Sequence, residues 1–219
     1  MSLRSSWQFI GGVNARTYRM FDRLRCGVNR RLVRYLGSHL PTSPEKPFFV
    51  LESGSGPAFA TSLFTDHREV RRAVCLDIDE TALQEAKRRD PRCLAVVGDM
   101  CNLPFRSNCF ALIFNSSTVE HLESPRDAIR EMARVCRNDG RVFVGVPYLF
   151  GPLIFQPLIR RTVIGEWLGP VFSRRRLARL LASEGLRPIE SIRYFLRFFI
   201  GTVATKGDTP IPLSKKVCT

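Results

Sequence analysis

The chain has 219 residues, of which 44% are hydrophobic and 25% are charged, and these values exclude a disordered, collagen-like or coiled-coil protein. A chain of this length forms one domain, or one domain with an elaborated flank. The 34 basic residues exceed the 20 acidic ones, but the excess lies at the two ends: residues 1–47 carry a net charge of +7, residues 48–150 of −1 and residues 151–219 of +8. This distribution predicts a core whose flanks meet something anionic, which can be nucleic acid, a membrane surface or an acidic substrate.

Residues 1–47 are predicted to form a basic helical arm. Apolar side chains recur every three to four residues from Tyr18 to Tyr35, with arginines between them. This spacing predicts one amphipathic helix, or two helices that break at Gly27. The arginine-bearing start has no acidic residue before Asp22, so a mitochondrial presequence is an alternative to the cytoplasmic protein that we expect.

The middle of the chain, residues 48–147, alternates strand-like and helix-like runs. Strands are predicted over residues 48–51, 70–76, 93–97, 110–114 and 141–146. Of the helices between them, one is predicted to begin near Pro57, one to run through Ala82, and one to begin at Ser124 and end at Gly140. This alternation predicts a parallel sheet with helices on both faces. Ligands of such sheets bind at the carboxyl ends of the strands. Polar or glycine residues stand at those ends, namely Glu52, Gly54, Gly56, Asp77, Asp99 and Asn115.

The turn after the first predicted strand reads Glu52-Ser53-Gly54-Ser55-Gly56. A dinucleotide fingerprint needs a third glycine where this chain has Phe59, and the lysine of a phosphate-binding P-loop is also missing. An acidic residue two positions before the first glycine suits a cofactor with a positive ammonium group rather than a pyrophosphate.

Five segments follow one another at regular spacing between Val50 and Pro147: VLESGSGPA, VCLDID, VVGDMCNLPF, FALIFNSSTVEHLESP and REMARVCRNDGRVFVGVP. Together they resemble class I S-adenosylmethionine-dependent methyltransferases, in particular the small-molecule group that includes the ubiquinone and menaquinone biosynthesis C-methyltransferases. The resemblance implies a methyltransferase with a Rossmann-like α/β fold: a doubly wound, mostly parallel, seven-stranded sheet whose last strand is antiparallel. It also implies S-adenosyl-L-methionine as the cofactor.

The glycine turn takes its expected role from this resemblance. Glu52 would lie near the methionine amino group, directly or through water, while Gly54 and Gly56 would let the backbone approach the cofactor. Ala58 stands where the family most often has a third glycine, which makes the turn slightly less permissive.

The ends of the second and third predicted strands would bind the nucleoside part. Asp77 would accept hydrogen bonds from both ribose hydroxyls, with Ile78 beside it in the cofactor site. Asp99 would accept a hydrogen bond from the adenine amino group, and Met100 would supply backbone and packing contacts.

The end of the fourth predicted strand would face the acceptor. Asn115 and Ser116 would lie at the methionine end of the cofactor. Methyl transfer from a sulfonium mainly requires positioning, and no catalytic side chain is obligatory. His121, beside Glu120, is the candidate general base because imidazole titrates near neutral pH, and a structural role at a helix start is the alternative.

The seven cysteines show no metal-binding or disulfide pattern. Their number is odd, no two form a C-x-x-C pair and no histidine cluster accompanies them. The sequence therefore predicts reduced thiols, a reducing compartment and no metal site. No apolar run reaches the ~18 residues that a membrane-spanning helix needs.

Residues 148–172 are predicted to be an apolar insertion after the fifth strand, and residues 173–219 a helix that begins at Ser173 with two closing strands over 189–195 and 198–205. Arg174, Arg175 and Arg176 would occupy the first turn of that helix, where the helix dipole disfavours cations. An anionic membrane would compensate for this cost. We therefore expect a hydrophobic acceptor, quinone-like or lipid-like, at a membrane surface, and a packed core insertion is the alternative.

Two other functions remain open at this stage. An RNA or protein methyltransferase is one, because RNA phosphates would satisfy the same charges. Nucleic acid is the less favoured partner, since the run Asn115-Ser116-Ser117-Thr118 lacks the (D/N)-P-P-(Y/F) motif of amino-group methyltransferases of nucleic acids. The other is a non-catalytic, membrane-bound binding or scaffolding module that retains the fold. The acceptor atom and the oligomeric state are left undetermined.

Overall fold

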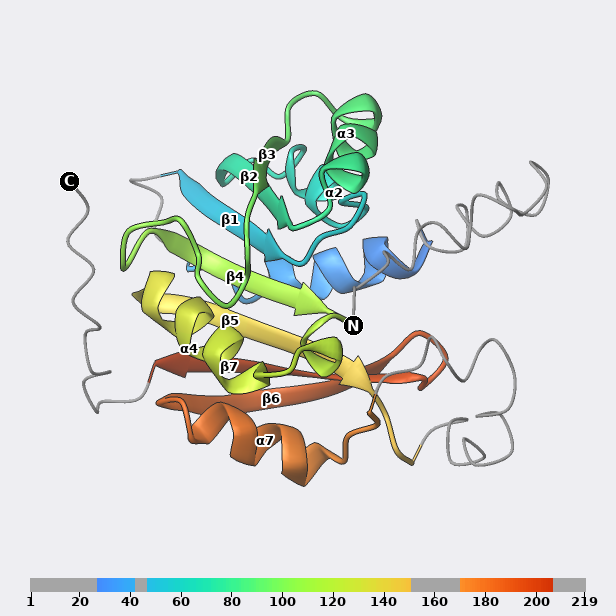
Figure 1. Cartoon of the computed structure of the whole chain (residues 1–219), viewed down its shortest axis with the longest axis vertical. Coiled ribbons are helices and arrows are strands. Elements are labelled where there is room, and N and C mark those ends of the chain that lie inside the picture. Colours follow the sequence, from blue (N-terminus) through green and yellow to red (C-terminus); the bar gives the residue numbers. More distant parts are fainter. Residues whose placement is uncertain (1–26, 42–46, 151–169, 207–219) are drawn as a thin grey trace.

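A single seven-stranded sheet forms the centre of the protein in the computed structural model, which describes residues 27–41, 47–150 and 170–206. The strand order is β3-β2-β1-β4-β5-β7-β6 (Figure 1). Strands β1 to β5 pair in parallel, and β7 runs antiparallel to both β5 and β6. The predicted mostly parallel sheet with an antiparallel last strand is confirmed. The strands are β1 (Phe48–Ser53), β2 (Val70–Asp77), β3 (Leu94–Val97), β4 (Phe110–Ser116), β5 (Cys136–Pro147), β6 (Leu186–Tyr194) and β7 (Phe199–Lys206).

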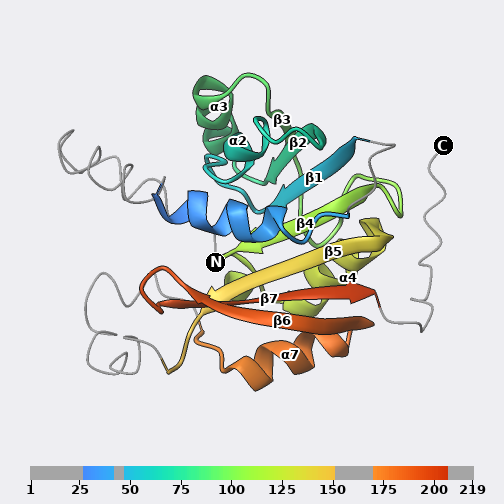
Figure 2. The ribbon, with the colours of Figure 1, turned by 180° about the vertical axis from the view of Figure 1, so that it is seen from behind.

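Helices cover both faces of this sheet, as Figures 1 and 2 show from opposite sides. A helix over residues 27–37, α2 (Thr61–Phe64) and α3 (Glu80–Arg89) cover one face. Helices α4 (Pro125–Val135) and α7 (Arg174–Ala182) cover the other. The doubly wound arrangement expected from the alternating sequence is therefore present.

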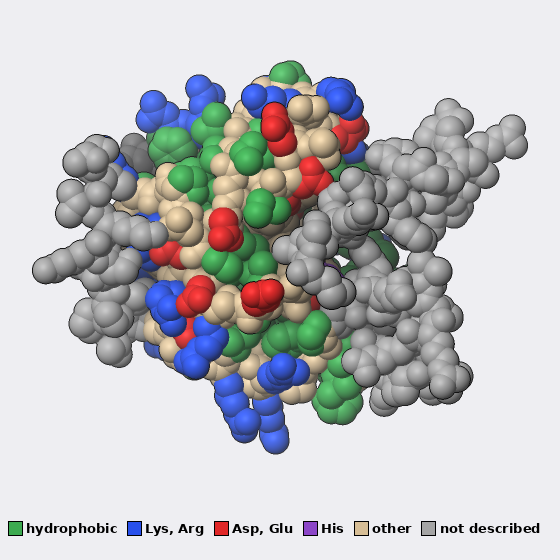
Figure 3. All heavy atoms as spheres, in the orientation of Figure 1, with side chains coloured by type: hydrophobic (Ala, Val, Ile, Leu, Met, Phe, Trp, Pro, Cys, Tyr) green, Lys and Arg blue, Asp and Glu red, His purple; other side chains and the backbone are tan. Residues whose placement is uncertain are grey.

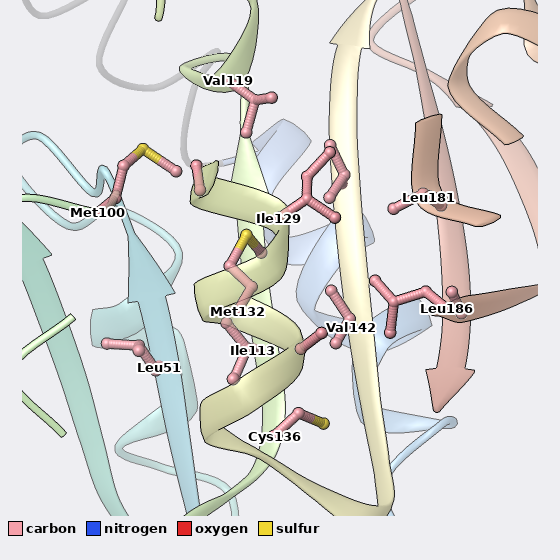
Figure 4. Packing of buried hydrophobic residues seen from close by; sticks show 14 of the residues in the cluster. Leu51, Met100, Ile113, Val119, Ile129, Met132, Cys136, Val142, Leu181 and Leu186 are labelled. Carbon is pink, nitrogen blue, oxygen red and sulfur yellow. The ribbon is translucent and has the colours of Figure 1, made fainter. Parts of the chain in front are cut away.

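Side chains that alternate along the strands divide the core into two layers. On the α4 and α7 side, Val142 of β5 packs with Ile129 and Met132 of α4 and with Leu181 of α7 (Figure 4). On the opposite side, a second cluster joins β4, β5, α2 and the helix over residues 27–37, with members Phe114, Phe143, Phe64, Leu32 and Leu36. A parallel sheet buried on both faces needs apolar residues in both alternating sets, which explains the continuous apolar run of β4.

The helix over residues 27–37 is amphipathic as predicted: Leu32 and Leu36 are buried, and Arg30 and Arg34 are exposed. The earlier part of the predicted arm lies outside the described residues, so a break at Gly27 stays a prediction. Residues 151–169 of the predicted insertion also lie outside them. The division into arm, core, insertion and C-terminal part consequently stays a prediction as well.

Two predicted helix boundaries are wrong. Pro57 does not begin a helix, because Ala58 adopts a φ of 53° and α2 begins only at Thr61. Gly140 does not end α4 either, since that helix ends at Val135 and Gly140 lies inside β5. A Cβ atom at position 140 would lie 2.9 Å from the carbonyl oxygen of Ala111, so close packing against the neighbouring strand explains this glycine.

Candidate functional site

The polar residues predicted from the sequence come together along one edge of the sheet, at the carboxyl ends of four adjacent strands. The loops after these strands are joined directly to one another. The Gly56 amide donates to Asp77 Oδ2 at 2.6 Å, which links the β1 and β2 loops. The Asn115 side-chain amide donates to the Ser53 carbonyl at 2.6 Å, which links β4 to β1. Hydrogen bonds therefore join the loops at this edge, which is where doubly wound sheets bind their ligands.

The turn after β1 uses left-handed backbone conformations at three positions. The φ angles are 70° at Gly54, 51° at Gly56 and 53° at Ala58. The amides of Gly54 and Ser55 both donate to the Leu76 carbonyl, at 2.8 and 3.0 Å. Ala58, at the position of the family's third glycine, adopts this conformation at a cost of roughly 1–2 kcal/mol for a residue with a Cβ atom. The turn is thus held tightly against the end of β2.

Asp77 holds this turn with one oxygen and its own loop with the other. Besides the Gly56 amide on Oδ2, the Asp79 amide donates to Oδ1 at 2.9 Å. The carboxylate is only half-buried, so it retains acceptor capacity toward a ligand. Ile78, the next residue, is 68% exposed and lies beside it at the same edge. Contact of both residues with the cofactor stays a prediction.

Glu52 is buried beneath the start of α2. Its Oε2 atom accepts hydrogen bonds from the Thr61 amide, at 2.9 Å, and from the Thr61 hydroxyl. Burial raises the pKa of the Glu52 carboxyl to about 7; the two Thr61 bonds act in the opposite direction and the Asp77 charge adds to the rise. In this arrangement Glu52 anchors α2 to β1. Its predicted approach to a methionine amino group is not tested by these contacts.

Asp99 and Met100 follow β3 but have different surroundings. Asp99 is exposed, and its Oδ1 atom accepts from the Cys101 amide at 2.8 Å. Met100 is buried in the core with Leu76 and Val119. The exposed Asp99 carboxylate is available to a ligand, whereas the buried Met100 side chain packs in the core beneath this loop. Their predicted adenine contacts stay predictions.

Asn115 is completely buried and uses its whole amide inside the protein. Its nitrogen binds the Ser53 carbonyl, and its oxygen accepts from the amides of Thr118 and Val119 at 3.3 and 3.2 Å. The neighbouring Ser116 hydroxyl lies 3.0 Å from the Tyr194 hydroxyl. Sequence reasoning missed Tyr194, because it is 78 residues away from Ser116 and only the sheet brings them together.

His121 lies at the end of a short 3₁₀ turn (Val119–His121), and its side chain is 37% exposed. Burial lowers the pKa of the imidazole. Its Nε2 atom lies 3.9 Å from Glu120 Oε1. The Glu120 side chain is completely buried and accepts a hydrogen bond from the Ser117 hydroxyl at 2.7 Å. The sequence had marked Glu120 only as the neighbour of His121, although it is the more deeply placed acid–base group.

The described part of the chain contains no group of three or more histidine, cysteine, aspartate or glutamate side chains arranged to hold a metal ion. Cysteines 75, 93, 101, 109 and 136 are free thiols. No helix within residues 27–41, 47–150 and 170–206 is long and apolar enough to cross a membrane.

The residues at this edge fit S-adenosylmethionine. Left-handed glycines at positions 54 and 56 let the backbone come close to a ligand without a Cβ atom between them. The half-buried carboxylate of Asp77 and the exposed carboxylate of Asp99 offer acceptors for hydroxyl and amino groups on adjacent strands. A lysine or a basic cluster for a pyrophosphate is missing from the turn at residues 52–58.

Comparisons with known proteins agree with this assignment of the ligand. Residues 51–144 match a family described as a methyltransferase domain. A probable S-adenosylmethionine-dependent methyltransferase of Mycobacterium tuberculosis is 31% identical over 98 residues, which are 45% of this chain and 35% of that protein. The demethylmenaquinone methyltransferase of Renibacterium salmoninarum is 29% identical over 147 residues, which are 67% of this chain and 58% of that enzyme. The chain spans between about a third and a half of the length of the mycobacterial relatives.

Among solved structures, a methyltransferase in complex with the Trm112 methyltransferase activator of Haloferax volcanii has the same fold. The TM-score is 0.74, with 16% identity, 94% coverage of this chain and 100% coverage of that chain. At this level of identity the likeness concerns the fold alone.

Proposed function

We propose that this chain, which contains a class I S-adenosylmethionine-dependent methyltransferase domain, methylates a hydrophobic small molecule at a membrane surface. The acceptor class that we propose is quinone-like or lipid-like. The observation that carries this proposal is a group of exposed apolar side chains at the carboxyl edge of the sheet, next to the proposed cofactor loops. The similarity to a demethylmenaquinone methyltransferase supports the same acceptor class.

This apolar group comes from two segments that are bonded to each other. Phe150, after β5, is 63% exposed, and Leu196, at the tip of the β6–β7 hairpin, is 76% exposed. The Tyr148 amide donates to the Phe198 carbonyl at 2.8 Å, which fixes the two segments side by side. The hairpin tip has left-handed φ angles at residues 195–197. Exposed apolar side chains beside a tip with strained, left-handed backbone are typical of a docking surface rather than of a solvated loop.

Arginines stand beside this surface. Arg174, Arg175 and Arg176 are exposed in the first turn of α7, and this turn contains no acidic residue. The helix dipole disfavours cations here by about 0.3–1 kcal/mol each, whereas an anionic leaflet attracts each of them by about 1 kcal/mol. In Figure 3, Lys and Arg side chains project from the edge of the molecule that α7 forms in Figure 1. Anionic lipid is therefore the partner that we propose for these residues.

The chain's contribution to the reaction is binding and orientation. Gly54, Gly56, Asp77 and Asp99 would hold S-adenosylmethionine, which supplies an electrophilic methyl group when bound. The loop after β4 would orient the acceptor toward that group, and the apolar segments after β5 would exclude water from it.

Label transfer from methyl-labelled S-adenosylmethionine tests this function. With total cell extract as the acceptor source, we expect label in the lipid fraction, resistant to nuclease and protease, and no label with Asp77→Ala. Label in the RNA or protein fraction would contradict the lipid acceptor and support the RNA or protein alternative. No label and no thermal shift with S-adenosylhomocysteine would instead support a non-catalytic binding module.

Membrane association has its own test. We expect the protein to float with vesicles that contain anionic lipid, and to do so less at higher salt. Phe150→Asp and Leu196→Asp should each weaken binding about tenfold or more, because one buried apolar side chain contributes roughly 1.5–3 kcal/mol. Leu94→Asp, which replaces an apolar side chain that is 51% exposed on edge strand β3, is the control and should float like the unchanged protein. Equal flotation of all four proteins would exclude this surface.

A further inference from the structure

Glu120 is a buried carboxyl group with one oxygen that has no hydrogen-bond partner. Its side chain is fully buried in the turn after β4. Oε1 accepts a hydrogen bond from the Ser117 hydroxyl at 2.7 Å, but Oε2 has no hydrogen-bond partner within the described ranges. Ser117 itself adopts a left-handed φ of 69°. One hydrogen bond from a serine does not explain why a carboxyl group is buried here. Buried polar atoms without partners are exceptional in proteins, so Oε2 needs a further explanation.

Tyr194, at the end of β6, is the second group of this cluster. Its hydroxyl lies 3.0 Å from the Ser116 hydroxyl. Gly145 of β5 leaves the space for it, because a Cβ atom there would lie 2.0 Å from the Tyr194 hydroxyl oxygen. The ring packs against Phe143 and Phe199, with centroid distances of 6.1 and 5.6 Å. Residues of β4, β5 and β7 therefore hold the Tyr194 phenol at the end of β4.

The charge of the Glu120 carboxyl acts on the Tyr194 phenol. Burial raises the pKa of the Tyr194 hydroxyl above its ordinary range, and the Glu120 charge raises it further. Burial also raises the pKa of Glu120 to about 7, while the Ser117 bond acts in the opposite direction. Within the described residues, the Ser117 hydroxyl is the hydrogen-bond partner of the Glu120 side chain, the His121 imidazole lies 3.9 Å from Oε1, and Tyr194 is near enough for its pKa to respond to the Glu120 charge.

This cluster lies next to the glycine turn. The Thr118 hydroxyl donates to the Gly54 carbonyl at 3.0 Å, and Thr118 stands two residues before Glu120. The β4 loop therefore contacts the proposed cofactor turn on one side and carries the buried carboxyl on the other. A carboxyl that changes protonation near neutral pH beside a ligand edge can accept a proton in a reaction.

We infer that Glu120 takes up the proton which the methyl acceptor loses, and that the Tyr194 and Ser116 hydroxyls bind the acceptor's polar atom beside it. This inference rests on the proposed methyl transfer. The bond between the acceptor atom and its hydrogen breaks, and the proton passes to the Glu120 carboxylate. The electron pair left on the acceptor atom forms the new bond to the methyl carbon. The bond between that carbon and the sulfonium sulfur breaks, and its electron pair remains on the sulfur.

The pH profile of Glu120→Gln tests this role, with unlabelled lipid extract as the methyl acceptor and the label that enters the lipid fraction as the readout. In the unchanged protein the rate should rise as the pH approaches about 7 and level off above it, because only the ionised carboxyl accepts a proton. Glu120→Gln should be slower by roughly 100-fold or more and should lose this rise. Its affinity for S-adenosylhomocysteine should stay within about twofold. Glu123→Gln, an exposed carboxyl in the same loop, is the matched control and should retain the full profile.

Two further variants separate a proton acceptor from a structural carboxyl. Ser117→Ala removes the bond that lowers the pKa of Glu120, so the inflection should move to higher pH. Tyr194→Phe should raise KM more than it lowers kcat, because it removes an acceptor contact and keeps the ring. Loss of the inflection in His121→Gln, with the inflection retained in Glu120→Gln, would overturn the inference in favour of the imidazole.

An infrared band of a protonated carboxyl provides a readout independent of turnover. Glu52, whose pKa burial also raises to about 7, should contribute a band of its own that remains in Glu120→Gln, so the Glu120 band is the component that Glu120→Gln loses; that component should be present below pH 7 and fade above it. A titrating band that is identical in the unchanged protein and in Glu120→Gln would overturn the role of Glu120. Label transfer with an unchanged pH profile in Glu120→Gln would overturn that role alone. No label in any fraction would overturn the methyl transfer, and the proton transfer with it.

Discussion

Gly54→Ala is expected to lower the free energy of unfolding by about 2–4 kcal/mol and to abolish measurable binding of S-adenosylhomocysteine. Gly54 has a φ of 70°, where a Cβ atom is unfavourable. That Cβ atom would also lie 2.7 Å from Thr118 Cγ2 and 2.9 Å from Thr118 Oγ1. Because Thr118 donates to the Gly54 carbonyl, the clash would push apart the β1 and β4 loops that border the site. Chemical denaturation and calorimetry measure the two effects.

Two control variants test the cause of this effect. Gly27→Ala adds the same methyl group at a position where no atom of a neighbouring described residue lies within 4 Å, and it should not destabilise the protein. Gly54→Ala combined with Thr118→Ala should recover part of the loss, because the clash partner is gone while the left-handed backbone remains. An additive double variant would show that the contact with Thr118 contributes nothing. A Gly54→Ala protein that binds the ligand normally would contradict the proposed cofactor turn.

Asp77→Asn is expected to weaken binding of S-adenosylhomocysteine about 100-fold, which corresponds to about 2.7 kcal/mol. The two carboxylate oxygens of Asp77 already accept from the Gly56 and Asp79 amides. An asparagine has one acceptor oxygen, so one of these amides would face an NH₂ group, and the predicted ribose hydroxyls would lose an acceptor as well. Isothermal titration measures the affinity.

Glu80→Gln supplies the matched control for this variant. It removes one negative charge from the first turn of α3, three residues further along, at an exposed position. Its affinity for S-adenosylhomocysteine should stay within about threefold of the unchanged protein, because exposed charges interact weakly. If both variants bind equally well, Asp77 does not contact the ligand, and the carboxylate only holds the turn together.

The alternation of apolar runs was sufficient to predict the sheet and its two helical layers. Each strand from β1 to β4 coincides with an apolar run that a polar or glycine residue follows, and β5 contains the apolar run 141–146, which ends before Pro147; the chain order of a βαβ fold follows from such runs. Helix limits were less predictable. Pro57 and Gly140 carry ordinary helix-boundary signals, but a left-handed Ala58 and close packing around Gly140 override them.

Among the site residues, sequence spacing located the loops but not the roles of their side chains. Glu52, Asp77 and Asn115 lie at the predicted strand ends. In the folded protein, Glu52 anchors Thr61 and Asn115 bridges two loops, which are long-range bonds that no local pattern encodes. His121 was the predicted acid–base candidate because of its residue type. Burial, which only the fold creates, distinguishes Glu120 from it.

The sequence by itself determined the fold class, the methyltransferase family resemblance and the edge of the sheet where the ligand residues stand. Hydrophobic periodicity and short motifs depend on residues that are close together in the sequence, so they can be recognised without the folded structure. The tertiary structure alone decided that Tyr194 reaches Ser116 and that Glu120 is removed from water. The contact of Tyr194 with Ser116 depends on the pairing of strands that are far apart in the sequence and on the space that Gly145 leaves. The raised pKa of Glu120 depends on its removal from water.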